Sequence, residues 1–234
     1  MFFLKVTSDD VCDVIGFEDE LKLLLPHFVA HLKDLRSSII KEMCRCLQSL
    51  ARQLGRSFEP AVLILLPHLQ ALLYVTIKII STSADECMVA LFGLSCSPKT
   101  FPTLLASMTD SHAVVRQKSA EYCLLLMQAC TGLSADCLEI VGGVARRAVE
   151  DSDTKTRAAG RALVIQMEGN YPAQGERLFS SLSTAVQKAV GKDRPGIKGK
   201  RFLPPSTIGD AQKTFKNYKK QRGESDNSNF MLVL

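Results

Sequence analysis

The amino-acid sequence predicts an all-α fold, a solenoid of stacked helical hairpins, on three observations. Apolar residues recur at steps of three and four over long segments, which is the spacing of one helix face. Leu and Ala are abundant, and glycine and proline fall mostly between these segments. Paired segments recur at intervals close to ~40 residues, the period of HEAT-type repeats. The 234 residues are therefore expected to bury one core spread along an array.

The first complete hairpin is predicted over residues 17–54. Its two helices carry apolar sets at helical spacing: Phe17, Leu21, Leu24, Phe28 and Leu32 in the first, and Ile39, Met43, Leu47, Leu50 and Leu54 in the second. The short segment KDLRS (33–37) joins them and offers Asp34 or Ser37 as the N-cap of the second helix. Two helices joined by so short a turn should pack antiparallel.

Three more hairpins and a closing helix follow in the same way. In the next hairpin, Ser57 is the predicted N-cap, Pro60 lies near the first turn and Pro67 should kink the helix. The partner of this helix is expected at about 78–95, after the turn YVTIK. The remaining predicted helices cover 97–108, 112–130, 134–150, 154–169 and 172–190, and the last has no predicted partner.

Two inter-helix turns repeat one pattern. DSHAVVR begins at Asp110 and DSDTKTR at Asp151, and each places an Arg six residues after the Asp, at Arg116 and Arg157. The Asp is predicted to accept backbone N–H bonds where the second helix begins. The Arg should reach a carboxylate in its own or the neighbouring turn. Because stacked hairpins align their turns, these residues are expected along one edge of the solenoid.

The charge is divided unevenly along the chain. Residues 188–234 hold eleven Lys and Arg against four Asp and Glu, a formal charge of +7, which leaves −2 for the rest. With Gly, Pro and Lys but little apolar periodicity, residues 192–234 are predicted to be a largely disordered basic tail with a short helix around 209–221. Few aromatic residues are interleaved and no RNA-binding motif occurs, so nucleic acid is not an expected partner.

The residue patterns favour a binding protein over an enzyme, a metalloprotein or a membrane protein. No Ser or Cys has a local nucleophile signature, and VGGVARR (141–147) lacks the Lys-Ser/Thr of a phosphate loop, so close helix packing is its expected role. His27 and His31 lie four apart but have no third ligand, so no metal and no cofactor is predicted. The longest apolar run, 61–77, is interrupted by Pro67 and is too short for a membrane span of ~20 residues.

The eight cysteines include no CxxC pair, and most lie on apolar stripes. Reduced, buried thiols are therefore expected, rather than disulfides or a zinc site. The chain has no signal peptide pattern, because MFFLKVTSDD turns acidic before an adequate apolar core. The apolar end NFMLVL is not a lipidation signal.

Residues 31–190 resemble the TOG domain of the CLASP family of microtubule-associated proteins. The resemblance begins in the KDLRS turn (33–37) and in LGRSF (54–58), which leads into the next helix. It continues in residues 64–86, with Pro67 in the helix and Lys78 just beyond the turn. It also includes residues 111–128, 150–164 and the closing segment 170–190. It implies that the inter-helix turns form a surface for αβ-tubulin, whose own surface is acidic. Carried over by position, that surface comprises Lys33, Leu35, Arg36, Ser37, Thr76, Ile77, Lys78, Ser111, His112, Asp153, Lys155 and Arg157.

The chain departs from the family pattern at its N-terminal end. TOG domains have six hairpin units, and the first carries a Trp that packs on β-tubulin, whereas this chain has no Trp and only sixteen residues before Phe17. The chain is therefore predicted to have three parts. Residues 1–16 are an N-terminal segment, either a remnant of a first hairpin or an alternative cap. Residues 17–191 are a TOG-like domain that lacks a complete first hairpin, and residues 192–234 are the tail. Loss of such an aromatic anchor commonly costs ~2 kcal/mol or more of binding free energy.

The resemblance implies a microtubule-associated protein of the cytoplasm and cytoskeleton, at microtubules and at the spindle or cilium. The tail would add long-range attraction to the acidic microtubule lattice through Lys198, Lys200, Arg201, Lys213, Lys216, Lys219, Lys220 and Arg222. The alternative is a HEAT-repeat adaptor that binds a different protein, including other cytoskeletal proteins. The missing Trp favours the adaptor, whereas the KDLRS turn, Lys78 and the tail favour tubulin.

Overall fold

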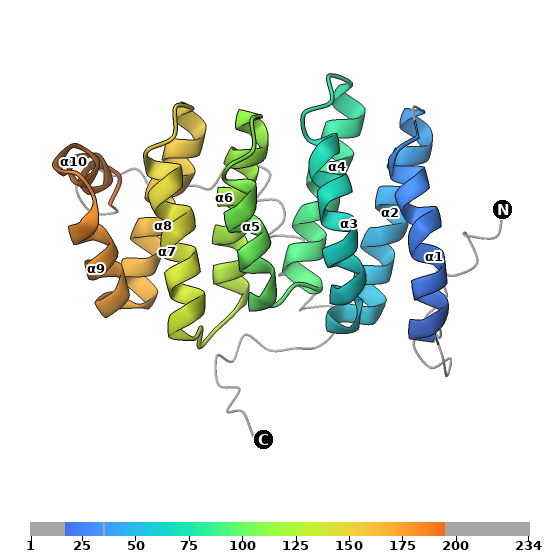
Figure 1. The fold of residues 1–234 in the computed structure, drawn as a ribbon, viewed down its shortest axis with the longest axis horizontal. Helices are drawn as coiled ribbons and strands as arrows, with labels where there is room; N and C mark the ends of the chain where they lie inside the picture. The colour runs from blue at the N-terminus through green and yellow to red at the C-terminus, as the bar shows by residue number, and fades with distance from the viewer. Residues whose placement is uncertain (1–16, 35, 195–234) are drawn as a thin grey trace. The chain divides into compact units, whose positions relative to one another are not determined.

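A computed structural model describes residues 17–34 and 36–194, and Figure 1 shows their helices standing side by side in a row. The all-α prediction is confirmed for these residues. The α-helices are α1 (Phe17–Leu32), α2 (Ser37–Leu54), α3 (Glu59–Leu72), α4 (Lys78–Leu94), α5 (Phe101–Ser107), α6 (Ala113–Ala129), α7 (Ala135–Val149), α8 (Thr154–Asn170), α9 (Pro172–Ser181) and α10 (Thr184–Asp193). Two short 3-10 helices, η3 (Gly55–Phe58) and η4 (Pro98–Thr100), precede α3 and α5.

The helices form two layers. In the view of Figure 1, α1, α3, α5, α7 and α9 lie in front of α2, α4, α6 and α8. Within the rear layer α2 packs on α4, α4 on α6, and α6 on α8, while α1 packs on α3 and α5 on α7 in the front layer. The apolar core lies between the layers and includes the fully buried Phe28, Phe58, Phe92 and Phe101. This is the predicted antiparallel stacking of hairpins, which places successive inter-helix turns at one edge.

Most of the predicted apolar residues of the first hairpin are buried, namely Leu21, Phe28 and Leu32 in α1 and Met43, Leu47 and Leu50 in α2. Leu25 and Ile40 are buried, whereas their predicted neighbours Leu24 and Ile39 are only half-buried. Each helix carries a run of adjacent aliphatic residues here, so spacing alone fits two registers, and packing against the next hairpin selects between them.

Two predicted helix boundaries are wrong. Ser57 does not cap α3: it lies in the 3-10 helix that begins at Gly55, where α2 ends with a positive φ of 55° that suits glycine. Pro60 does lie in the first turn of α3, as predicted. The single closing helix predicted over 172–190 is instead two helices, because Ser183 accepts a bond from the backbone N–H of Val186 (3.4 Å) and starts α10 anew. Both α9 and α10 pack on α8.

Glycines permit close helix packing at the C-terminal end of the array. A Cβ added at Gly160 of α8 would lie 2.6 Å from the backbone N of Val149 in α7, and one added at Gly175 of α9 would lie 2.5 Å from the backbone of Glu168. The packing role predicted for VGGVARR is confirmed at Gly143, where an added Cβ would lie 3.2 Å from a methyl of Leu105 in α5. The closest approaches, at Gly160 and Gly175, were not predicted.

A buried polar cluster between α4 and α6 was also not predicted. The Lys118 ammonium lies 2.8 Å from Asp85 and 3.0 Å from Glu121, and the Tyr122 hydroxyl donates to Asp85 at 2.7 Å. Burial alone would lower the pKa of Lys118, but the two carboxylates outweigh it and raise that pKa. The cluster ties two neighbouring hairpins by ionic bonds within the packed layer.

The cysteines are mostly buried, as expected. Among the described residues Cys44, Cys87, Cys96, Cys123 and Cys130 are buried free thiols, and Cys46 and Cys137 are half-buried. Burial raises the pKa of the Cys96 thiol to about 12, so it stays protonated near neutral pH. Over the described ranges, no helix has the combined length and apolarity to cross a membrane.

Candidate functional site

Four inter-helix turns lie along one edge of the array, at the top of Figure 1. They are the segments 33–36 between α1 and α2, 73–77 between α3 and α4, 108–112 between α5 and α6, and 150–153 between α7 and α8. We call this set, together with the first turn of each following helix, the turn edge. It contains all the predicted contact residues that the structure describes, whereas Leu35 and the tail residues from Lys198 to Arg222 lie outside the described residues.

Three of the four turns contain the same hydrogen bond between an Asp side chain and the backbone. Asp34, Asp110 and Asp151 each accept a hydrogen bond from the backbone N–H two residues later, at 2.8, 2.7 and 2.8 Å. The prediction that the turn Asp accepts backbone N–H bonds is confirmed. The predicted N-cap of α2 is wrong, because Arg36 occupies the N-cap position and Ser37 is the first helical residue. Asp34 lies too early in the turn to reach the helical N–H groups.

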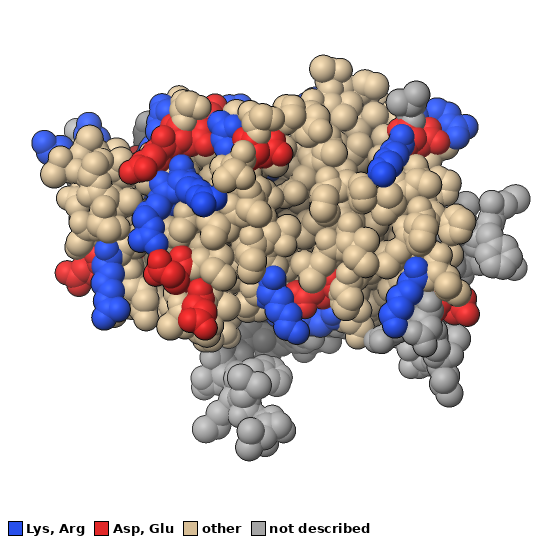
Figure 2. Space-filling model, viewed as in Figure 1, with Lys and Arg blue, Asp and Glu red and all other residues tan. Residues whose placement is uncertain are grey.

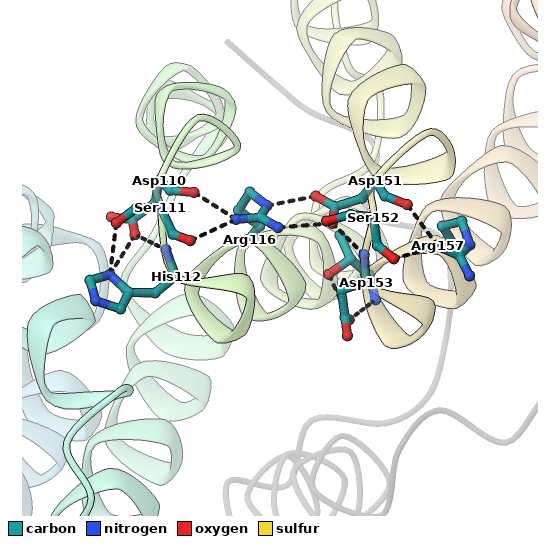
Figure 3. Close-up of polar contacts among 9 residues, drawn as sticks. Asp110, Ser111, His112, Arg116, Asp151, Ser152, Asp153 and Arg157 are labelled. Atoms are coloured by element: carbon teal, nitrogen blue, oxygen red, sulfur yellow. Dashed lines mark hydrogen bonds and ion pairs between the residues drawn. The ribbon is translucent and has the colours of Figure 1, made fainter.

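Arg116 joins the third turn to the fourth (Figure 3). Its Nε and Nη2 donate to the two carboxylate oxygens of Asp151 at 2.6 and 3.0 Å. Its Nη1 donates to the backbone carbonyls of Asp110 and Ser111 in its own turn, at 2.8 and 3.1 Å. The prediction that this Arg reaches a carboxylate in a neighbouring turn is confirmed. For Arg157 it is wrong, since that side chain contacts carbonyls and a hydroxyl.

The Arg116–Asp151 pair should make stability pH-dependent. Hydrogen bonds from Arg116 lower the pKa of Asp151, and both side chains are largely buried. A carboxylate with a lowered folded-state pKa stabilises the fold above its unfolded pKa and loses that contribution as pH falls through the folded value. We expect Arg116→Gln to lower the free energy of unfolding by about 1–2 kcal/mol at pH 7. The deficit should shrink as pH falls below about 4.

Urea denaturation at several pH values measures this deficit. Arg45→Gln is the matched control, because Arg45 pairs with Glu42 on the exposed surface of α2 and such pairs contribute little. A deficit for Arg116→Gln that stays constant from pH 7 to pH 3 would show that the ion pair is not its source.

In the first turn the predicted residues are exposed or half-exposed. Lys33 and Arg36 face solvent, and Ser37 is half-buried. Arg36 is not a free cation, since its Nε and Nη2 donate to Asp34 at 3.0 and 2.9 Å. These bonds lower the pKa of Asp34 to about 2. An acidic partner would therefore meet Arg36 as half of a surface ion pair.

The second and third turns are joined by an aromatic stacking contact that was not predicted from the sequence. Thr76, Ile77 and Lys78, which belong to the predicted contact surface, are exposed. Tyr74, in the same turn, stacks on the His112 ring with ring centroids 3.7 Å apart and planes 3° apart. Nδ1 of the same His112 ring lies 2.9 Å from Oδ1 of Asp110. The alternation of polar and apolar residues in YVTIKII could have indicated exposed apolar side chains in this turn. The stacking on His112 could not be predicted, because it depends on how two hairpins pack against each other.

Of the predicted contact residues in the fourth turn, Asp153 and Arg157 make hydrogen bonds within the turn, whereas Lys155 is exposed. The Asp153 carboxylate caps α8, accepting from the backbone N–H and the hydroxyl of Thr156 at 2.8 and 3.0 Å. These bonds lower the pKa of Asp153. Lys155 is exposed. Arg157 is half-buried and donates to the carbonyls of Asp151 and Ser152 at 2.9 and 2.7 Å.

Three helices begin at this edge without a capping side chain. The N-cap residues of α2, α4 and α6 are Arg36, Ile77 and His112, none caps through its side chain, and none of these helices has an acidic residue in its first turn. The first N–H groups of such helices and the positive ends of their dipoles point out of the edge. The turn edge is therefore suited to negatively charged groups. In the part of the chain that the structure describes, no cluster of His, Cys, Asp and Glu could hold a metal ion.

Comparison with known proteins gives a family match. The model of the family described as CLASP N terminal matches residues 14–191. A CLIP-associated protein of Arabidopsis thaliana is 26% identical over 206 residues, covering 87% of this chain and 14% of that protein. CLIP-associating protein 1-B of Xenopus laevis is 26% identical over 176 residues, covering 75% of this chain and 12% of that protein. The chain thus spans only a small part of the length of these relatives.

Solved structures agree in fold. A chain from a study described as "Crescerin uses a TOG domain array to regulate microtubules in the primary cilium" superposes with a TM-score of 0.61 at 14% identity, over 78% of both chains. A chain described under "TOG-tubulin binding specificity promotes microtubule dynamics and mitotic spindle formation" gives a TM-score of 0.57 at 15% identity, over 82% of this chain and 75% of the other. At this identity the likeness establishes the TOG-like HEAT array.

Proposed function

Because the chain belongs to the CLASP N-terminal family, we propose that its turn edge binds the αβ-tubulin heterodimer and that the protein thereby regulates microtubule dynamics or stability. Domains of this family are non-catalytic binding modules, in agreement with the sequence-based prediction that the protein is not an enzyme. Tubulin binding would place the chain on the microtubule cytoskeleton.

An exposed apolar group at the centre of the turn edge carries the proposal. Tyr74, Ile77 and Ile79 are 43%, 48% and 56% exposed, and they account for three of the five large exposed hydrophobic side chains in the described residues. All three lie within one turn and the start of α4. Exposed aromatic and aliphatic side chains that are held in place and surrounded by polar groups are the usual anchors of protein interfaces. Tyr74 is held in place by its stacking on His112.

Positive electrostatics around this apolar group fits an acidic partner. Lys33, Lys78 and Lys155 are exposed at the first, second and fourth turns. The uncapped N-terminal ends of α2, α4 and α6 add positive potential along the same edge. Separate exposed charges each contribute little to affinity, but together they steer association and fix the register of the partner.

The adaptor alternative rests on a different surface. In Figure 2 most charged side chains of the visible face lie along its upper and lower borders and over α7, leaving an uncharged area over α1, α3 and α5. Leu23 of α1 and Ile64 of α3 are 68% and 52% exposed. A non-tubulin protein partner of the adaptor would bind there rather than at the turn edge.

The basic tail is proposed as a second, weaker binding element. Its Lys and Arg residues between 198 and 222 lie outside the described residues, so the proposal rests on charge alone. Attraction between a basic segment and the acidic microtubule lattice is screened at a Debye length of about 8 Å at physiological salt. Tail-dependent binding should therefore weaken steeply as salt rises.

The combined substitution Arg36→Ala, Lys78→Ala and Lys155→Ala tests the function. All three side chains are exposed, so the melting temperature should stay unchanged while the affinity for αβ-tubulin falls about tenfold at low salt. Co-elution of the full chain with αβ-tubulin on a sizing column, followed by a binding titration, measures both. On stabilised microtubules the variant should retain binding at low salt through the tail and lose it at high salt.

Failure of the unsubstituted chain to bind either tubulin or microtubules would overturn the proposed function. Binding to microtubules alone, with no co-elution with the heterodimer, would assign the interaction to the tail. The non-tubulin partner of the adaptor alternative would then be sought at the uncharged area over α1, α3 and α5.

A further inference from the structure

We infer that the array bends between its second and third hairpins, and that Asp85 is the latch that holds the two parts in the arrangement of Figure 1. The N-terminal block comprises α1 to α4, and the C-terminal block comprises α5 to α10. The junction between the blocks is the boundary of α3 and α4 with α5 and α6, together with the connecting residues 95–100. This motion needs no partner, so it is independent of the proposed function.

Helix packing is weaker at the junction than inside either block. In the rear layer α4 packs on α6 much less extensively than α2 packs on α4 or α6 packs on α8. In the front layer α1 packs on α3 and α5 on α7, whereas α3 and α5 make only slight contact. One reason is length, since α5 has 7 residues and its neighbours α3 and α7 have 14 and 15. The junction is therefore held by less helix packing than the boundaries on either side of it.

A buried carboxylate joins the rear layer across the junction. Asp85 of α4 accepts hydrogen bonds from Nζ of Lys118 at 2.8 Å and from the hydroxyl of Tyr122 at 2.7 Å, and both donors belong to α6. Asp85 and Tyr122 are buried. The buried residues of α2, which lies on the other side of α4, are all apolar. The contact of α4 with α6 thus depends on one polar side chain to a degree that its contact with α2 does not.

Hydrogen bonds also join the front layer across the junction. Oε1 of Glu59, the first residue of α3, accepts from the backbone N–H of Ser97 at 2.6 Å and from the hydroxyl of Thr100 at 3.3 Å, in the segment that leads to α5. Nε2 of Gln70, also in α3, donates to the hydroxyl of Ser107 in α5 at 2.8 Å. Polar groups therefore connect the two blocks in both layers.

A polar junction separates more readily than an apolar one. Water replaces the hydrogen bonds that are lost when the groups move apart, so each bond contributes little net free energy. The cost of removing Asp85 and Lys118 from water offsets much of the attraction between their charges. Apolar surfaces that separate gain no such replacement from water. Because hydrogen bonds are directional, they also favour one arrangement of the blocks over all others.

A stacked aromatic pair provides the pivot. The rings of Phe92 in α4 and Tyr122 in α6 have centroids 5.0 Å apart and planes 18° apart, and both side chains are buried. Aromatic pairs keep their contact over a range of offsets and tilts. The bond from the Tyr122 hydroxyl to Asp85 weakens steeply as its angle changes. A small rotation about the stacked rings therefore releases Asp85 before it separates the helices.

The turn edge is divided between the two blocks. Its first and second turns belong to the N-terminal block, and its third and fourth turns belong to the C-terminal block. The stacking of Tyr74 on His112 is the contact that crosses the junction at this edge. Bending at the junction would therefore change the spacing between the second and third turns, and with it the shape that the edge presents to a partner.

Double electron–electron resonance on the full chain tests the motion. Spin labels are attached to a ketone-bearing amino acid introduced at Lys41 of α2 and Asn170 of α8, two exposed positions in different blocks, so that the native cysteines stay in place. Asp85→Asn keeps the size of the latch and removes its charge, while Lys118 retains Glu121 at 3.0 Å as an ion-pair partner. The population with an altered label distance should rise about tenfold, which corresponds to about 1.4 kcal/mol.

Asp151→Asn is the matched control. It breaks the Arg116–Asp151 pair by the same chemical change, but this pair lies inside the C-terminal block, where α6 packs extensively on α8. The distance distribution between the two labels should stay that of the unsubstituted chain. A second label pair at Ala106 and Asn170, both exposed in the C-terminal block, should report one unchanged distance in every variant. Equal broadening in Asp85→Asn and Asp151→Asn, or a changed distance within the C-terminal block, would overturn the inference.

Tyr122→Phe is a milder second variant. It removes only the hydroxyl that donates to Asp85 and keeps the ring that stacks on Phe92. The altered population should rise about threefold, since one hydrogen bond across the junction is lost. This variant decides the question if a low melting temperature shows that Asp85→Asn does not fold. A distance distribution for Tyr122→Phe identical to that of the unsubstituted chain would show that the two blocks form one rigid body.

Discussion

Replacing Gly160 by alanine should lower the free energy of unfolding by about 3 kcal/mol. An added Cβ would lie 2.6 Å from the backbone N of Val149 and 2.7 Å from the Cβ of Ala148. The clashing atoms belong to the α7 backbone and to a side chain that cannot rotate away, so α7 and α8 must separate. These two helices share one of the most extensive contacts of the array. The better helix propensity of alanine, about 1 kcal/mol, offsets only part of the cost.

Gly169→Ala is the control in the same helix, since nothing lies within 4 Å of its added Cβ. It should leave stability unchanged or raise it by less than about 1 kcal/mol. Thermal and urea unfolding of both variants measures the difference, which corresponds to roughly 6–12 °C in melting temperature for a domain of this size. Equal stability of the two variants would show that α7 and α8 separate at little cost, and the close packing at Gly160 would then not be required for the fold.

The helices and their order could be predicted from the sequence because local signals agree with one another. Apolar spacing, Pro60 in a first turn and short turns each indicate the same hairpins. The failures occur where local signals are ambiguous. The break between α9 and α10 at Ser183 is set by one capping bond within an otherwise periodic segment. Ser57 resembles an N-cap but lies inside the 3-10 helix Gly55–Phe58.

The candidate site was only partly predictable, because its key contacts join distant turns. The reach of Arg116 could be predicted, since the repeated Asp-to-Arg spacing shows that successive turns are alike. The stacking of Tyr74 on His112 and the buried Lys118 cluster could not, because both depend on how two hairpins pack. The contacts of Arg157, to two carbonyls and a hydroxyl, could not be predicted either, because the sequence of its turn repeats that of Arg116.

Ile77→Asp should weaken tubulin binding about 100-fold while leaving the protein at least as stable. Ile77 is 48% exposed at the centre of the turn edge, and removing a central apolar anchor commonly costs about 2 kcal/mol or more. The new carboxylate would also repel an acidic partner. Stability should not suffer, because Ile77 is the N-cap of α4 with extended backbone angles (φ −73°, ψ 104°), a position that Asp fills well.

Ile64→Asp is the matched control for this substitution. Ile64 is equally exposed, at 52%, but lies in the middle of α3, away from the turn edge. Its substitution makes the same chemical change at an exposed position outside the turn edge, so it should alter tubulin affinity less than twofold. Dissociation constants for both variants, measured beside their melting temperatures, separate the two surfaces. If Ile64→Asp abolished binding and Ile77→Asp did not, the exposed side of α3 would belong to the binding surface. The apolar group of the second turn would then have no part in it.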